Sequence, residues 1–142
     1  MLYKIGVDLG GTKTEIIVLD ENLNILERKR VPTPQNNYNE IIHTIETLVS
    51  DVSQNISDFS LGICCPGSIS KQTGLIKNSN TQCLIGKSLK KDLEHKLQKT
   101  ISIENDANCF TLSESKMGAG IGFGLVFGVI LGTGVGGGIV IN

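Results

Sequence analysis

Residues 5–19 of this 142-residue chain read IGVDLGGTKTEIIVL, and this stretch decides the fold class. Two apolar, β-branched runs of strand composition flank Gly10 and Gly11, and paired glycines permit a tight turn and a close approach of the backbone to a ligand. The stretch therefore predicts a β-hairpin. Its tip, formed by Gly10, Gly11, Thr12 and Lys13, offers backbone N–H groups, a hydroxyl and an ammonium to a phosphate.

Two commoner phosphate motifs do not fit this stretch. The P-loop requires Gly-Lys-Thr followed by a helix, whereas Gly11-Thr12-Lys13 leads into residues 15–19, which have strand composition. The dinucleotide fingerprint also requires a helix after its glycines. Asp8 favours a ligand-binding tip over a plain tight turn, because an acid at the end of an apolar strand is costly unless it serves a cation, a water or a donor.

The composition is that of a soluble globular protein of one domain. With 13 Lys+Arg against 14 Asp+Glu, the chain has no basic face that would indicate a nucleic-acid partner. Met1 leads directly into a strand pattern, so we expect neither a leader nor a membrane segment and infer a cytoplasmic protein. Cys64, Cys65, Cys83 and Cys109 lack the spacing of a zinc site or a redox pair and are expected to be buried thiols.

Hydrophobic periodicity places the other elements. Apolar residues at 41, 42, 45, 48, 49 and 52 predict a helix with one buried stripe. Strands are expected at 25–31, 59–65 and 101–103, the second of them covered on both faces. A polar loop over 68–87 is expected to be functional, and helices should follow Ser88 and occupy 107–117.

The glycine-rich end of the chain repeats its beginning. Residues 127–141 read FGVILGTGVGGGIVI, and at an offset of 122 six of fifteen positions match residues 5–19. The glycine turn falls at the same place, but Ile130 stands where Asp8 stands in the first copy. We expect a second glycine hairpin without the acid, and therefore two related lobes that hold a nucleotide between them.

Four motifs in order resemble those of the ROK family of bacterial sugar kinases and sugar-responsive repressors. They are DLGGTK at 8–13, GICCPG at 62–67, ENDAN at 104–108 and LGTGVGGG at 131–138. The resemblance covers the whole chain and is strongest to the family's fructokinases (mannofructokinases), through residues 32–34, 66–70 and 73–80.

The resemblance implies an α/β fold of the ribonuclease-H-like, actin and hexokinase kind, with a mixed sheet and flanking helices. Residues 1–121 would form an N-terminal lobe that binds ATP and sugar, and residues 122–142 the first hairpin of a second, truncated lobe. The implied reaction is ATP-dependent phosphorylation of a hexose hydroxyl. An N-acetylglucosamine kinase or glucokinase of the same family is the alternative to a fructokinase.

The same resemblance assigns the site residues. Gly10, Gly11, Thr12 and Lys13 would hold the nucleotide phosphates together with Gly132, Thr133 and Gly134 of the second hairpin, and Asp8 would organise Mg²⁺ through water. Asp106 would be the catalytic base and Asn105 a sugar ligand, with Gly67, Ser68, Asn78 and Asn80 also at the sugar. Residues 105–106 could instead cap the following helix, and Asn78 and Asn80 could belong to a plain surface loop.

Several parts of a complete family member have no counterpart in this sequence. The second lobe's sugar-binding Glu and His, its zinc-binding cysteine cluster and most of the adenine pocket are missing, so we expect the chain alone to phosphorylate sugar poorly. A repressor's sugar-sensing domain is a rival hypothesis, although no helix-turn-helix precedes the first strand, and an ATPase module of the chaperone or actin kind is another. The apolar second hairpin is expected to drive formation of a homodimer or other self-association.

Overall fold

The computed structural model describes residues 2–132 and 135–142, and its contacts divide the chain into two compact units. The first is Met1–Ile103 and the second is Glu104–Asn142. The lobe boundary expected from the sequence lies after residue 121, whereas the contacts group helix α3 (Asp106–Met117) with the hairpin that follows it. Each unit is described by itself below.

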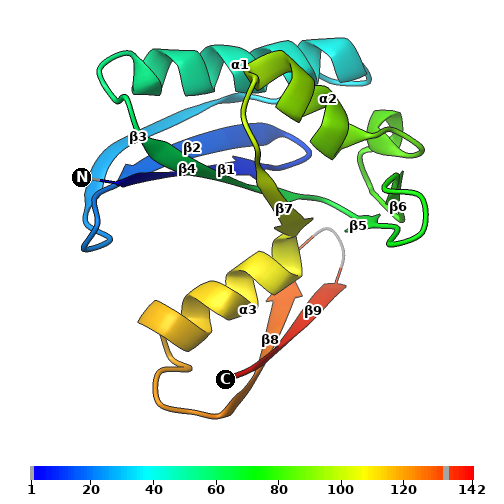
Figure 1. Cartoon of the computed structure of the whole chain (residues 1–142). Coiled ribbons are helices and arrows are strands. Elements are labelled where there is room, and N and C mark those ends of the chain that lie inside the picture. The colour runs from blue at the N-terminus through cyan, green and yellow to red at the C-terminus, as the bar shows by residue number, and fades with distance from the viewer. Residues whose placement is uncertain (1, 133–134) are drawn as a thin grey trace. The chain divides into compact units, whose positions relative to one another are not determined.

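The first unit is built on a five-stranded mixed sheet, as expected. Its strands are β1 (Tyr3–Leu9), β2 (Lys13–Leu19), β3 (Ile25–Pro32), β4 (Phe59–Cys65) and β7 (Ser102–Asn105), in the order β3-β2-β1-β4-β7 (Figure 1). Strand β1 pairs antiparallel with β2 and parallel with β4, and β2 pairs antiparallel with β3. The predicted opening hairpin is therefore confirmed, and β1 lies inside the sheet.

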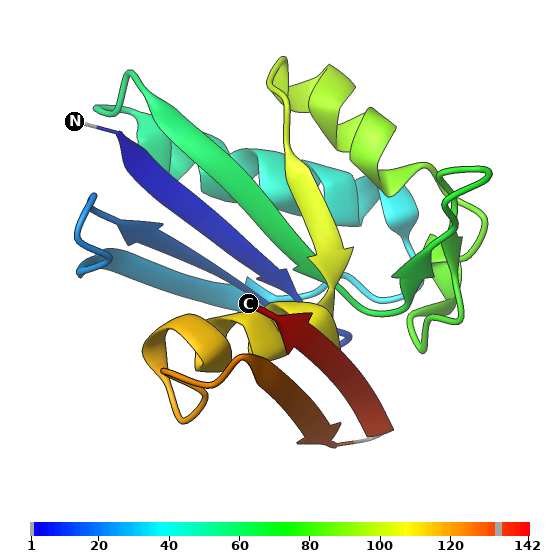
Figure 2. The same ribbon diagram turned by 60° about the horizontal axis from the view of Figure 1, so that its bottom comes forward.

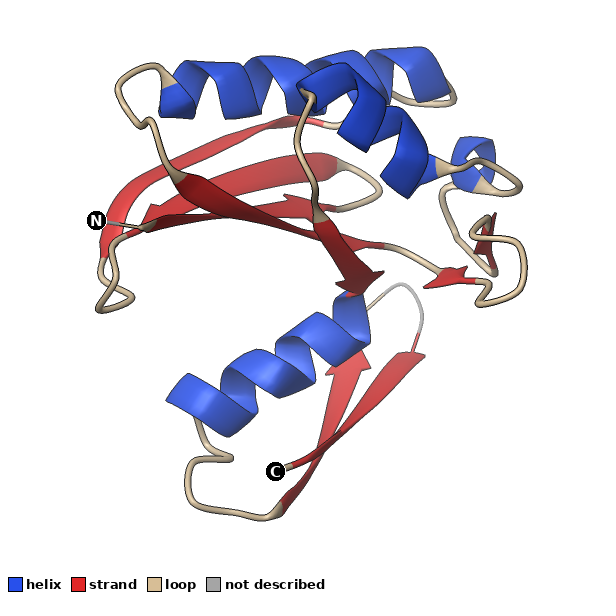
Figure 3. Ribbon diagram, in the orientation of Figure 1, coloured by secondary structure: helices blue, strands red, loops and turns tan. Residues whose placement is uncertain are grey.

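Helices α1 (Tyr38–Ser53) and α2 (Leu89–Leu97) cover one face of this sheet, as Figure 3 shows. Helix α1 begins at Asn37, whose side chain accepts a hydrogen bond from the Glu40 amide and so satisfies a free N–H of the first turn. All six apolar positions of the predicted stripe are buried: Ile41, Ile42, Ile45, Leu48, Val49 and Val52. No helix in the part of the chain that the structure describes is both long and apolar enough to cross a membrane.

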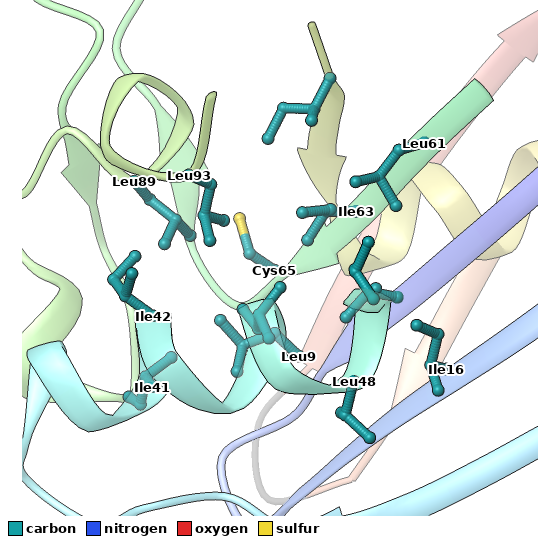
Figure 4. Packing of buried hydrophobic residues seen from close by; sticks show 14 of the residues in the cluster. Leu9, Ile16, Ile41, Ile42, Leu48, Leu61, Ile63, Cys65, Leu89 and Leu93 are labelled. Atoms are coloured by element: carbon teal, nitrogen blue, oxygen red, sulfur yellow. The ribbon is translucent and has the colours of Figure 1, made fainter. Parts of the chain in front are cut away.

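The core of the first unit lies between these helices and the sheet (Figure 4). Alternate residues of β1, β2 and β4 point into it, so Leu61, Ile63 and Cys65 of β4 are buried while Gly62 and Cys64 are half-buried. The expectation that this strand is covered on both faces was wrong for the face of Gly62 and Cys64, which is only half-buried. The small residues Gly62 and Cys64 make the run look continuously apolar although only one set of side chains packs against the helices.

The long polar loop contains a second, small sheet and a short helix. Strand β5 (Ser68–Ile69) pairs antiparallel with β6 (Ile76–Lys77), so that Ser68 lies opposite Lys77. The 3₁₀ helix η1 (Gln82–Leu84) follows and buries Leu84 in the core. The loop is therefore held by regular hydrogen bonds and by the core.

The second unit consists of α3 and a hairpin of β8 (Leu125–Leu131) and β9 (Val135–Ile141), seen from another side in Figure 2. The bounds of these two strands are those of β1 and β2 shifted by 122 residues, which confirms the predicted repeat. The pairing differs by one residue, since Leu9 pairs with Thr14 but Leu131 pairs with Val135.

Close packing of α3 explains two of the glycines in this hairpin. A Cβ atom on Gly128 would overlap the side chain of Thr111, and one on Gly138 would come within 2.6 Å of the Ala107 carbonyl oxygen. Thr111 turns its own hydroxyl back onto that carbonyl oxygen, at 2.7 Å. The helix backbone can therefore approach the hairpin only where side chains are absent.

The other face of this hairpin is apolar and exposed. Its exposed side chains are Leu125, Phe127, Val129, Leu131, Val135, Ile139 and Ile141. The sequence contains no charged residue after Lys116. Large exposed apolar patches of this kind usually mark a surface that another element or molecule covers.

Candidate active site

The tip of the β1–β2 hairpin is a tight turn that requires glycine. The Gly10 amide donates to the Lys13 carbonyl at 3.0 Å and closes the turn. A Cβ atom on Gly10 would lie 2.7 Å from that same carbonyl oxygen, so no side chain fits there. Among the described residues, none accepts a hydrogen bond from the amides of Gly11 and Thr12, and the Lys13 side chain is exposed. The tip thus presents the donors that a phosphate needs.

Asp8 is placed beside this tip. It is an exposed residue of β1, opposite Glu15 of β2 and Cys64 of β4 in the sheet register. Residues 2–132 and 135–142 contain no group of three His, Cys, Asp or Glu side chains that could hold a metal ion by themselves. One carboxylate next to a phosphate-binding turn nevertheless suits Mg²⁺, which commonly takes one or two carboxylates, substrate phosphates and several waters.

The parallel pairing of β1 and β4 brings a second turn to the same edge of the sheet. Because Asp8 lies opposite Cys64, Gly10 and Pro66 each begin a turn two residues beyond this pair. In open α/β sheets, ligands bind outside the carboxyl ends of the strands. This register therefore places the predicted sugar turn next to the predicted phosphate turn.

The residues predicted to bind sugar within the first unit converge on this second turn. Gly67 has a φ of +90°, and a Cβ atom there would lie 2.7 Å from the Lys77 carbonyl and 2.9 Å from the Ser79 Cβ. Ser68 is paired with Lys77, and the exposed Asn78, with a φ of +54°, and Asn80 follow directly. Gly67, Ser68, Asn78 and Asn80 thus come from two segments that the β5–β6 pairing holds side by side.

Thr81 belongs to the loop over residues 68–87, which we call the sugar loop, and lies near residues 10–13, which we call the phosphate tip. A Cβ atom on Gly11 would lie 3.4 Å from the Thr81 hydroxyl oxygen. That oxygen is buried, and it has no hydrogen-bond partner among the described residues. Sequence reasoning missed Thr81, because nothing in the one-dimensional pattern sets it apart from the other polar residues of the loop.

Asn105 and Asp106 belong to the second unit, where they begin α3. The Asn105 side chain caps the helix and accepts from the amides of Ala107, at 3.0 Å, and Asn108, at 3.4 Å. Asp106 is the first helical residue and is exposed, and its carboxylate accepts from the Ala107 amide at 2.8 Å. The structure thus confirms the helix-capping alternative that the sequence allowed for this pair. The catalytic role of Asp106 stays a prediction.

The second hairpin presents Gly132 as an exposed residue at the end of β8. Thr133 and Gly134, also predicted to meet the phosphates, lie outside the described residues. Ile130, the counterpart of Asp8, is a half-buried residue of β8.

The titratable groups with clearly perturbed pKa values lie outside these turns. Partial burial and a 2.5 Å hydrogen bond to Asp92 raise the pKa of Tyr38. The Lys90 ammonium and the Ile101 amide lower the pKa of Glu94. The Tyr38–Asp92 hydrogen bond joins α2 to α1, and the Ile101–Glu94 hydrogen bond joins α2 to the residue before β7. Both therefore stabilise the fold.

Replacement of Gly67 by Ala tests the sugar turn. We expect G67A to weaken hexose binding at least tenfold, because the new Cβ would clash with backbone and the left-handed conformation alone costs about 1–2 kcal/mol. G62A is the matched control, since a Cβ atom at Gly62 meets nothing within 4 Å. Calorimetric titration with hexose measures both variants, and equal affinities for G67A and G62A would contradict the assignment.

Comparison with known proteins shows the family to which the chain belongs. The model of the ROK family matches residues 4–142. The N-acetyl-D-glucosamine kinase of Pectobacterium atrosepticum is 43% identical over 111 residues, which are 78% of this chain and 36% of that protein. The chain therefore spans little more than a third of the length of this relative.

Solved structures of sugar kinases have a similar fold. A ROK family glucokinase from Streptomyces griseus, in complex with glucose and AMPPNP, is 33% identical with a TM-score of 0.87 and matches 98% of this chain and 44% of its own. An inorganic polyphosphate/ATP-glucomannokinase from Arthrobacter is 28% identical with a TM-score of 0.83 and matches all of this chain and 62% of its own. Because the ROK family model matches nearly the whole length of this chain, the chain belongs to the ROK family.

Proposed function

We propose that this chain supplies the nucleotide-phosphate turn and much of the sugar site of an ATP-dependent hexose kinase. The observation that carries the proposal is the proximity of the phosphate tip and the sugar loop, since a Cβ atom on Gly11 would lie only 3.4 Å from the Thr81 hydroxyl oxygen. Phosphoryl transfer requires the terminal phosphate and the accepting hydroxyl to be held side by side. The orphaned Thr81 hydroxyl supports this placement, because a polar ligand group bound there would satisfy it.

N-acetylglucosamine is the first candidate substrate. The relative from P. atrosepticum is named for that sugar, and the S. griseus structure contains glucose. Fructose, which the sequence motifs favour, and mannose complete the set to be tested. Asn78 and Asn80 suit any of these sugars, because each amide both donates and accepts hydrogen bonds.

Each site residue has a role in this proposal. The amides of Gly11 and Thr12 and the Lys13 ammonium bind the ATP phosphates at the turn that Gly10 closes, with Gly132, Thr133 and Gly134 as further phosphate ligands. Asp8 holds a Mg²⁺ ion through water, and this ion would neutralise charge on the phosphates. Asn105 binds a sugar hydroxyl, and Asp106 accepts the proton of the attacking hydroxyl. The reaction would take place in the cytoplasm.

The role of Asp106 can be tested in a fusion that replaces the matched part of the P. atrosepticum kinase with this chain. We expect D106N to lower kcat by roughly 10²–10⁴, the usual contribution of a positioned general base, while hexose affinity stays nearly unchanged. The readout is ADP formation with each of the four sugars, and D58N, at an exposed Asp before β4, is the control. A D106N fusion as active as the D58N fusion would remove the proposed base. The unfused chain should show little turnover.

We further propose that isolated copies of this chain associate through the exposed face of the β8–β9 hairpin. Both strands are seven residues long and uncharged, and their edges lack the lysines and prolines that usually prevent edge-to-edge pairing. A second copy offers the same apolar surface and edge, so the contact would be self-complementary.

Analytical ultracentrifugation of a lysine variant tests this association. We expect the unmodified chain to form dimers or larger species and I139K to be monomeric, because a charge would be buried without a partner in the contact. I121K is the control, since Ile121 is similarly exposed but lies outside both strands. A monomeric unmodified chain, or equal disruption by I121K, would contradict the proposal.

A further inference from the structure

The hairpin tip is held from behind by a segment that none of the roles above uses. Three consecutive carbonyl oxygens of the tip accept hydrogen bonds from residues 33–35. The Thr33 hydroxyl donates to the Gly10 carbonyl at 2.8 Å, the Gln35 side chain donates to the Gly11 carbonyl at 2.9 Å, and the Thr33 amide donates to the Thr12 carbonyl at 2.9 Å. We call Thr33 and Gln35 the brace.

The protons of the brace can be assigned by elimination. The Thr33 hydroxyl has one proton and gives it to the Gly10 carbonyl, so in its 2.8 Å contact with Thr14 the Thr14 hydroxyl is the donor. Both threonines are buried, with 1% of Thr14 and 3% of Thr33 exposed. Gln35 uses its second amide proton on the Thr33 carbonyl, at 2.9 Å. The network leaves the brace a single arrangement.

Pro32 and Pro34 prepare this arrangement. Each ring fixes its own φ, and a residue that precedes proline avoids the helical region, so Pro34 keeps Thr33 extended. Pro32 is the last residue of β3 and pairs with Lys13 at the start of β2. The segment therefore leaves the sheet in an extended conformation directly beneath the tip.

The brace decides where the donors of the tip point. In a trans peptide the C=O and the following N–H point in opposite directions. Because the carbonyls of Gly10 and Gly11 are turned toward the brace, the N–H groups of Gly11 and Thr12 are turned away from it. These are the two amides for which the described residues provide no acceptor.

We propose that Thr33 and Gln35 are positioning residues that fix the amides of Gly11 and Thr12 for the phosphates of ATP. The inference rests on the proposed function and adds to it a second layer behind the phosphate turn. Such preorganised donors need no rearrangement when charge arrives, which is why their alignment affects phosphate binding more than a single hydrogen bond would suggest.

Separate titrations of the 142-residue chain with MgATP and with N-acetylglucosamine test the brace. Q35M keeps the length of the side chain but loses both donated hydrogen bonds, and since Gln35 is exposed this variant should fold. We expect it to weaken MgATP binding about five- to thirtyfold, the effect of one or two lost hydrogen bonds, and to leave sugar affinity within about twofold. Q54M, at the exposed end of α1, is the matched control and should bind both ligands normally.

Variants of Thr33 provide a second test in the same titrations. T33V removes the hydroxyl and should resemble Q35M in its ligand selectivity, while T33S restores the hydroxyl and should bind MgATP nearly as the unmodified chain does. A merely structural role would lower both affinities in parallel with the melting temperature, and this outcome would overturn the inference. So would unchanged MgATP binding by a folded Q35M.

The two proposals fail in different ways. If the unmodified chain binds neither ligand, the proposed function falls and the brace falls with it. If the chain binds both ligands and only the selective loss in Q35M and T33V is missing, the brace alone is wrong.

Discussion

The parallel pairing of β1 with β4 is the constraint on which the candidate site depends. It sets Asp8 opposite Cys64, so the two strands end together and each continues into a glycine turn at the same edge of the sheet. The antiparallel pairing of β1 with β2 closes one of these turns, and the β5–β6 pairing holds the other. Helices α1 and α2 bury the alternate residues of these strands, and a slip of one residue would expose that whole set.

The backbone carbonyl and N–H groups of the hairpin tip have different partners. The carbonyl oxygens of Gly10, Gly11 and Thr12 bond to residues 33–35, and the opposite sides of the same peptides are left for a ligand. The second hairpin reproduces the strand bounds of the first but carries Ile130 in place of Asp8, and its Gly128, Gly136 and Gly138 serve close packing against α3. The repeat therefore keeps the backbone plan of the first hairpin without its acid.

Local pattern was sufficient to predict much of the fold. The stripe of α1, the opening hairpin and the second glycine hairpin follow from periodicity and from paired glycines, which act over a few residues. The coverage of β4 was misjudged because Gly62 and Cys64 count as apolar whether or not anything packs on them. The grouping of α3 with the second hairpin depends on contacts between Thr111 and Gly128 that no local signal encodes.

The turns of the candidate site were predictable to a similar degree, and the roles of their residues stay predictions. Motifs identified Gly10–Lys13, Gly67 and Asn78, whose backbone conformations or turn positions require particular residues. The motif Pro32-Thr33-Pro34 did not indicate the brace, since the hydrogen bonds of Thr33 and Gln35 to the tip join residues more than twenty positions apart. Thr81 was missed for the same reason, because only its burial near Gly11 suggests a role, and its neighbours in sequence do not.

The proposed site requires the tip of the first hairpin to bind phosphate through its backbone amides. Amide NMR spectra of the ¹⁵N-labelled chain, recorded during titration with Mg²⁺ and AMPPNP, test this most directly. We expect the resonances of the Gly11 and Thr12 amides to shift most, and those of amides in the β2–β3 turn, such as Asn22, to stay in place. Saturation with nucleotide that leaves the Gly11 and Thr12 amides unmoved would contradict this requirement.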